Sequence, residues 1–150
     1  MPPPSNNPAL HLRVISEPFF VVQLEVGEEI PQSVLRDLTS GCGGFFSVTR
    51  TEEEISVVGK SYKGMPKFHE ERSTWVAIKI IGPLEHSTSL TGVLASLTAP
   101  LKVAKVPVFA LSTWKTDYVL VPTKKLQEAI RALRGDDWVF EQELIVKSRL

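Results

Sequence analysis

The sequence is poor in cysteine: Cys42 is its single cysteine among 150 residues. One thiol cannot form an internal disulfide, so a hydrophobic core must hold the fold, and a reducing compartment is expected. The sequence also lacks an excess of charge of either sign, because 17 basic residues balance 17 acidic ones. A net charge of zero argues against nucleic acid or an anionic membrane as a partner attracted by bulk electrostatics.

Long hydrophobic runs are absent as well, since no apolar stretch approaches the roughly 20 residues that a membrane span needs. The opening residues, MPPPSNNPAL, are rich in proline and lack the apolar centre of a signal peptide. A cytoplasmic location is therefore expected, without membrane attachment. Residues 1–9 have little to bury and are expected to form a disordered tail.

Patterns of catalytic and cofactor sites are also missing. The three histidines, His11, His69 and His86, are scattered along the chain, and no two have the spacing of metal ligands. No GxGxxG or GxxxxGK[ST] phosphate loop occurs, and no base is evident as a partner for Cys42. We therefore expect a protein that is not an enzyme and that needs neither metal nor cofactor.

The sequence does contain alternating strand and helix patterns. In the first half, a helix is predicted to begin near Pro31 and to end at Gly41, and the polar stretch 61–74 is predicted to be a linker with at most one helical turn. Runs rich in β-branched and aromatic residues predict strands at residues 11–15, 19–26, 45–50 and 54–60. The last two should form a hairpin.

The second half predicts strands at 75–81, 106–113, 117–122 and 138–146, with helices at about 90–105 and after a Thr123 cap as far as Gly135. This order, βαββαβ, is that of ferredoxin-like domains, and the first half has a shortened βαββ order. The expected class is α+β, with antiparallel sheets and helices on one face. A shortened module would cover residues 10–74 and a complete module residues 75–150.

The helix predicted at 90–105 has two faces without charge. Its core stripe consists of Leu90, Val93, Leu94, Leu97, Leu101 and Ala104. The opposite face carries Gly92, Ala95, Ser96, Ala99 and Val103, where a solvated helix would carry charged residues. The other module covers this face, or its composition is accidental, or the face contacts a ligand or a second subunit. Pro100 is expected to bend the helix or to end it early.

Two polar features lie near this helix and near the hairpin that follows it. Ser87, Thr88 and Ser89 precede the helix, where free amide groups bind anions, although plain N-capping explains such serines equally well. Asp117 stands at the start of a strand, after the turn in LSTWKTDYVLVP. It either hydrogen-bonds to turn amides, a common role of aspartate, or faces a ligand cation.

Three segments resemble a known family: FFSVTRTEEEISVV, GPLEHSTSLTGVLASLTAPL and LSTWKTDYVLVP. They are similar to the tandem ACT-domain proteins, a group that includes bacterial stand-alone ACT pairs and the cytosolic arginine sensors of the TOR pathway. The resemblance runs from about residue 13 to residue 134. It implies the ACT fold and an amino-acid ligand bound between modules.

The resemblance also implies roles for particular residues. Thr113, Trp114 and Asp117 match positions that hold the ligand's cationic side chain. The positions that contact its amino-acid backbone match Ser87, Ser96 and Leu97. Leu90 stands where the arginine-binding half of the sensors has an acidic residue, so the amino acid stays open.

The sensors contain two such halves and this sequence contains one, so the resemblance implies a homodimer that builds the cleft from two copies. The expected function is that of a non-catalytic amino-acid sensor or regulator, with a possible regulatory protein partner. The alternative is a protein–protein interaction module without a ligand.

Overall fold

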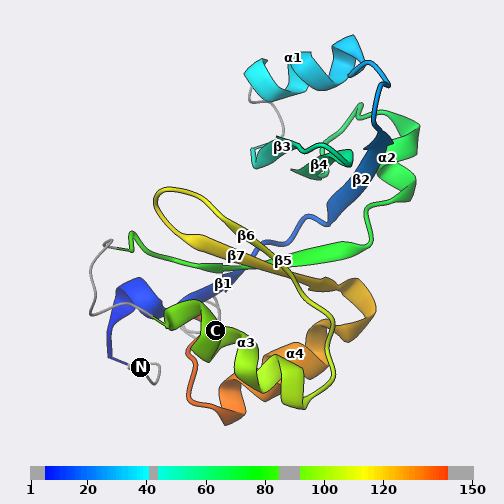
Figure 1. The fold of residues 1–150 in the computed structure, drawn as a ribbon. Helices are drawn as coiled ribbons and strands as arrows, with labels where there is room; N and C mark the ends of the chain where they lie inside the picture. Colours follow the sequence, from blue (N-terminus) through cyan, green and yellow to red (C-terminus); the bar gives the residue numbers. More distant parts are fainter. Residues whose placement is uncertain (1–5, 41–43, 85–91, 142–150) are drawn as a thin grey trace. The chain divides into compact units, whose positions relative to one another are not determined.

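The structure is a computed structural model that describes residues 6–40, 44–84 and 92–141 (Figure 1). The chain divides into two compact units. The central unit consists of residues 17–75, and the flanking unit combines residues 1–16 with 76–150. The sequence pattern had placed residues 10–16 in the first module, whereas in the structure they belong with the second. No helix among the described residues has the length and apolarity to cross a membrane.

The central unit contains a three-stranded antiparallel sheet in the order β3–β4–β2. The elements are β2 (Phe19–Glu25), α1 (Gln32–Ser40), β3 (Phe46–Arg50), β4 (Glu54–Lys60) and α2 (Lys67–Glu71). The hairpin predicted in this half is confirmed as β3 and β4, and the single helical turn expected in the linker is α2. Buried side chains from β2, α1 and β4 form the core: Phe20, Val22, Val34, Ile55 and Val57.

His69 is a buried titratable residue of the central unit. Its side chain is 5% exposed, and its ring stacks on Phe20 with 4.6 Å between centroids. Its Nδ1 has no hydrogen-bond partner among the described residues. Burial lowers the pKa of His69; the nearby Asp37 carboxylate opposes this shift, and the Arg72 guanidinium adds to it.

The stability of the central unit is therefore expected to fall as the pH drops from about 7.5 to about 5.5. Unfolded His69 takes up a proton near its ordinary pKa of 6.5, whereas the folded form resists protonation. Urea denaturation at both pH values, followed by the amide signals of β4, measures the loss. His69→Phe keeps an aromatic ring on Phe20 and should reduce the difference between the two pH values. The control variant His11→Gln, in the flanking unit, should leave this difference in stability unchanged. If His69→Phe also leaves it unchanged, the loss of stability is not due to His69.

The flanking unit contains a four-stranded sheet in the order β1–β5–β7–β6. A 3-10 helix (Pro8–Leu10) precedes β1 (Leu12–Val14). The remaining elements are β5 (Trp75–Ile80), α3 (Val93–Val103), β6 (Phe109–Ser112), β7 (Asp117–Pro122), a 3-10 turn (Thr123–Lys125) and α4 (Leu126–Gly135). Helices α3 and α4 cover one face of this sheet (Figure 1), as the α+β pattern predicts.

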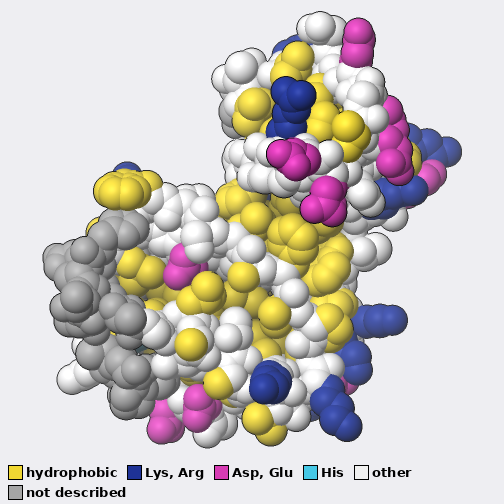
Figure 2. All heavy atoms as spheres, viewed as in Figure 1, with side chains coloured by type: hydrophobic (Ala, Val, Ile, Leu, Met, Phe, Trp, Pro, Cys, Tyr) yellow, Lys and Arg dark blue, Asp and Glu magenta, His cyan; other side chains and the backbone are white. Residues whose placement is uncertain are grey.

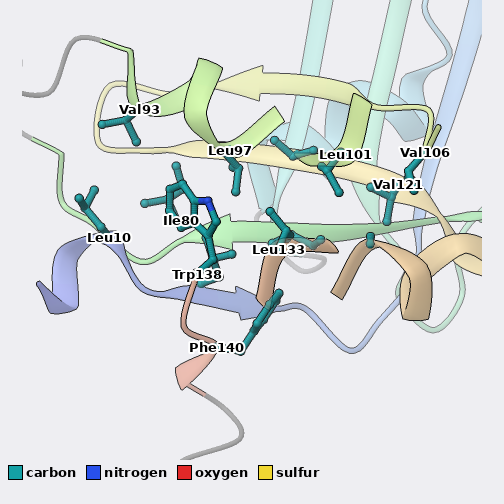
Figure 3. Close-up of a cluster of buried hydrophobic side chains, with 14 residues drawn as sticks. Leu10, Ile80, Val93, Leu97, Leu101, Val106, Val121, Leu133, Trp138 and Phe140 are labelled. Carbon is teal, nitrogen blue, oxygen red and sulfur yellow. The ribbon is translucent and has the colours of Figure 1, made fainter. Parts of the chain in front are cut away.

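The core of the flanking unit lies between this sheet and its two helices. Leu97 and Leu101 from α3 point toward the sheet and pack with Leu133 of α4 (Figure 3). Val93 is buried in the same cluster, and Leu94 and Ala104 pack against it. The predicted core stripe of α3 is thereby confirmed for every member that the structure describes; Leu90 lies outside the described residues.

The two ends of the chain differ from the sequence-based prediction. Pro8 and Ala9, at the end of the expected tail, belong to a 3-10 helix that Asn7 caps, and the next residue, Leu10, is 3% exposed within the core. β1 pairs antiparallel with β5, with Leu12 opposite Ile80. At the other end of the chain, a strand was predicted at 138–146. In the described part of that stretch, Phe140 makes a single parallel bridge to Leu12, and residues 142–150 lie outside the described residues.

The helix boundaries also differ in detail. α3 begins at Val93 after Gly92, whose φ of 90° is left-handed, and it continues through Pro100 to Val103. Thr123 does not cap a helix with its side chain; it begins the 3-10 turn before α4. α4 ends at Gly135, as predicted. The predicted helix end at Gly41 lies outside the described residues.

Candidate functional site

The turn between β6 and β7 carries three of the predicted ligand contacts, Thr113, Trp114 and Asp117. Thr113 closes the turn with its main chain and its side chain. Its amide donates to the Thr116 carbonyl at 2.9 Å, and its Oγ1 accepts from the Thr116 amide at 3.4 Å. The turn is thus held by two threonines.

Thr116 fixes this turn against the loop that leads to α3. It is 4% exposed, and its hydroxyl donates to the carbonyl of Ile80, the last residue of β5, at 2.6 Å. Leu84 donates its amide to the Lys115 carbonyl at 2.7 Å. Gly82 has a φ of 68°, and a Cβ there would lie 3.2 Å from Thr116, so glycine permits this close approach. Residues 82–84, the described start of the pre-helix loop, therefore lie beside the turn; both the loop and the turn were predicted from the sequence to contact a ligand.

Asp117 faces Ser112 across the hairpin, because the two residues are paired in the β6–β7 register. The Ser112 hydroxyl donates to Asp117 Oδ1 at 2.6 Å. Both side chains lie at the surface end of the hairpin, with Ser112 exposed and Asp117 half-buried. This hydrogen bond orients the carboxylate while leaving it acceptor capacity for a cation.

Trp114 and Thr113 lie on the same turn and are exposed, Trp114 to 80%. A large aromatic side chain so exposed is a common anchor for a ligand or a partner, because its flat face excludes water from a polar contact nearby. Thr113, Trp114 and Asp117 thus belong to one small surface.

The remaining predicted residues belong to α3 and to the loop before it. Ser96 is half-buried in the first turn of α3, and its amide donates to the Gly92 carbonyl at 2.9 Å. Leu97 is 0% exposed, so its side chain is part of the core and only its main chain could contact a ligand. Ser87 lies outside the described residues.

The outward face of α3 is small and apolar, as the sequence predicts. Ala95 and Ala99 are exposed, and Val103 is 83% exposed. Beside them is a shallow hollow of about 660 Å³, lined by Ala95, Thr98, Ala99, Lys102, Lys105, Val106, Pro107 and Val108. Hydrophobic side chains are visible among neutral ones over α3 (Figure 2). This surface, the α3 groove, is suited to contact with another protein surface.

Two contributors to the site were not predicted from the sequence: Ser112, which orients Asp117, and Thr116, which ties the turn to β5. The position of Ser112 could have been found by pairing the hairpin outward from its turn. Thr116 gives no comparable signal, since turn threonines are usually exposed. No group of three or more metal-ligating side chains occurs in the part of the chain that the structure describes.

Two comparisons with known sequences agree with the resemblance described above. Residues 70–135 match a family model described as an ACT domain. The chain is 29% identical over 106 residues to the human protein named "Cytosolic arginine sensor for mTORC1 subunit 1". That match covers 65% of this chain and 32% of the sensor, so the chain spans about a third of the length of the curated relatives it matches. The resemblance noted in the sequence is confirmed.

Comparison with solved structures finds proteins that share the fold of this chain. A protein from Agobacterium tumefaciens has a TM-score of 0.69 and 25% identity, over 87% of this chain and 90% of that one. The structure of aspartokinase α and β subunits has a TM-score of 0.56 and 14% identity, over 84% of this chain and 96% of that one. The predicted ferredoxin-like ACT fold is confirmed.

Proposed function

We propose that the chain is a non-catalytic regulatory protein that binds a free amino acid, on the premise that residues 70–135 match the family model of an ACT domain. The observation that carries the proposal is the Asp117 carboxylate, which accepts from Ser112 at the start of β7, next to a turn that contacts residues 82–84. The similarity to a protein named as a cytosolic arginine sensor supports an amino-acid ligand and a cytosolic location.

In this proposal the hairpin turn binds the cationic group of the ligand. Asp117 accepts hydrogen bonds from an ammonium or guanidinium group, while Thr113 and Trp114 flank the same position. The pre-helix loop with Ser87, together with Ser96 and the main chain of Leu97, binds the ligand's amino and carboxylate groups. The two sets of contacts come from different elements, and two copies of the chain complete one cleft.

Two features of the flanking unit support a homodimer. β6 is the last strand of the sheet order, and none of its residues, Phe109–Ser112, is charged or proline. Sheet edges that resist pairing usually carry charged residues or proline, so the composition of β6 permits pairing with another strand. The α3 groove is apolar and contains exposed Val108, which directly precedes β6. A second copy would cover both surfaces.

Ala95→Glu is expected to convert the homodimer into monomers that remain folded. Ala95 is exposed on α3 and lines the α3 groove, so a carboxylate there would be desolvated in the dimer while the core face of the helix stays intact. Sedimentation velocity measures the mass of both proteins, and circular dichroism checks the fold. The control is Arg131→Glu, an exposed substitution on α4. A wild-type protein that sediments as a monomer at high concentration would contradict the two-copy cleft.

A second candidate function is a protein–protein interaction module without a ligand, which the α3 groove favours. A thermal-shift screen of the full chain against the common amino acids separates the two functions. A ligand at 100 times its dissociation constant stabilises the folded protein by about 2.7 kcal/mol, which raises the melting temperature measurably. If no amino acid stabilises the protein, the interaction module is the better account.

A further inference from the structure

The central unit contains a hollow of its own, with a volume of about 740 Å³. Its walls come from three segments of this unit: the residues before β2, the loop after β4, and the end of α2. The loop is shaped by Gly64, whose φ of 88° is left-handed, and by a hydrogen bond from the Met65 amide to the Tyr62 carbonyl at 3.3 Å. A further bond, from the Ser61 amide to the Pro18 carbonyl at 2.8 Å, joins this loop to the first segment.

The charged side chains that line this hollow are of both signs. Lys60 and Lys63 come from the β4 side, and Glu70 comes from α2. None of these three makes an ion pair with any residue in the described part of the chain. Glu17 adds a second carboxylate to the lining. The lining thus includes side chains of both charges.

Two serine hydroxyls in the hollow are arranged as acceptors. Ser61 donates its hydroxyl hydrogen to Ser73 Oγ at 2.9 Å, and Ser73 donates its own to the His69 carbonyl at 3.0 Å. Each hydroxyl has a single hydrogen, so both are used within this chain of bonds. The lone pairs that remain on the two oxygens accept hydrogen bonds. The Ser61–Ser73 pair together with Glu70 therefore suits an N–H donor.

We propose that this hollow binds a small zwitterion, a molecule that carries one anionic and one ammonium group. The anionic group lies at Lys60 and Lys63, and the ammonium group donates to Glu70 and to the hydroxyls of Ser61 and Ser73. An anion alone would be repelled by the carboxylates, and a cation alone by the lysines, so the lining favours a ligand with both charges. This site lies entirely in the central unit and does not depend on the proposed site at Asp117.

Three probes of equal chain length test the charge requirement on the full-length protein. They are 4-aminobutyrate, which has both charges, butyrate, which has only the anion, and butylamine, which has only the cation. Titrations followed by amide NMR signals are expected to show saturable shifts at residues 60–73 with 4-aminobutyrate. Each single-charge probe should bind about tenfold more weakly or worse, because one charged hydrogen-bonded group is lost.

Substitutions of lining residues test whether 4-aminobutyrate binds in the hollow. Lys63→Gln and Glu70→Gln should each weaken the binding of 4-aminobutyrate by about tenfold. Lys67→Gln is the matched control, because Lys67 is an exposed lysine of α2 outside the lining. Arg131→Gln, an exposed substitution on α4 of the flanking unit, should leave this binding unchanged. The amide signals of residues 60–73 report on the hollow, so their outcome is independent of the function proposed above. The proposal is overturned if 4-aminobutyrate does not saturate, if butyrate binds equally well, or if Lys67→Gln weakens binding as much as Lys63→Gln.

Discussion

Leu97→Ala is expected to lower the free energy of unfolding by about 2–5 kcal/mol, the range measured when a fully buried leucine is cut back to alanine. Leu97 is 0% exposed and packs in the core between α3, α4 and the sheet. The substitution removes apolar surface and leaves a cavity that the neighbouring side chains can only partly fill. Urea denaturation measures the change through its midpoint and slope.

The matched control for Leu97→Ala is Val103→Ala on the same helix. Val103 is 83% exposed, so its truncation should change the free energy of unfolding by no more than about 0.5 kcal/mol. The resemblance places Leu97 at the ligand, and because its side chain is buried, only its main chain could make that contact. Alanine retains that main chain. Ligand affinity, measured where the variant is still folded, should therefore change little. Similar losses of stability in both variants would mean that Leu97 is not a core residue.

The spacing of apolar residues was sufficient to predict the local elements around this core. Val93, Leu97 and Leu101 recur every four residues, which puts them on one face of a helix, and each is buried in the structure. Pro100 was expected to bend this helix or to end it early, because proline removes a main-chain hydrogen bond. α3 nevertheless continues to Val103, with Leu97 and Leu101 buried on either side of the proline. Tertiary packing here outweighs the local preference of proline to end a helix.

Long-range pairing could not be predicted in the same way. β1 has three residues, and its partner β5 begins at Trp75, so nothing local in the sequence indicates that Leu12 lies opposite Ile80. The pattern at 138–146 predicted a strand but did not indicate its partner. Periodicity predicts the type of an element and cannot by itself identify the strand with which it pairs.

The candidate site was predictable in part. The turn and Asp117 follow from the hairpin pattern, but the contact between Thr116 and Ile80 joins residues far apart in the sequence and depends on the tertiary fold. The ligand roles of Ser96, Thr113 and Trp114 came from the family resemblance, and they stay predictions. From the sequence alone, Asp117 could either hydrogen-bond to turn amides or bind a ligand cation. The geometry adds that its carboxylate accepts from Ser112, while Thr113 and Thr116 close the turn.

Asp117→Asn is expected to weaken the binding of the amino-acid ligand roughly tenfold or more, because a charged hydrogen bond contributes about 1.5–3 kcal/mol. Asparagine has nearly the same size, and its Oδ1 still accepts from the Ser112 hydroxyl, which donates at 2.6 Å in the structure. Stability should therefore change little, since the substitution removes the charge and keeps the hairpin contact. Isothermal titration of both proteins measures the affinity, and thermal denaturation measures the stability.

Ser112→Ala serves as the companion variant for this experiment. It leaves the Asp117 charge in place and removes the hydroxyl that orients it, so affinity should fall by less than in Asp117→Asn. The charge also orders the candidate ligands: arginine, lysine and small neutral amino acids should bind better than aspartate and glutamate, whose second carboxylate is repelled by Asp117. If Asp117 has only a structural role, Asp117→Ala lowers the melting temperature while Asp117→Asn leaves affinity unchanged. A preference for glutamate that survives Asp117→Asn would rule out a cation-binding role for this carboxylate.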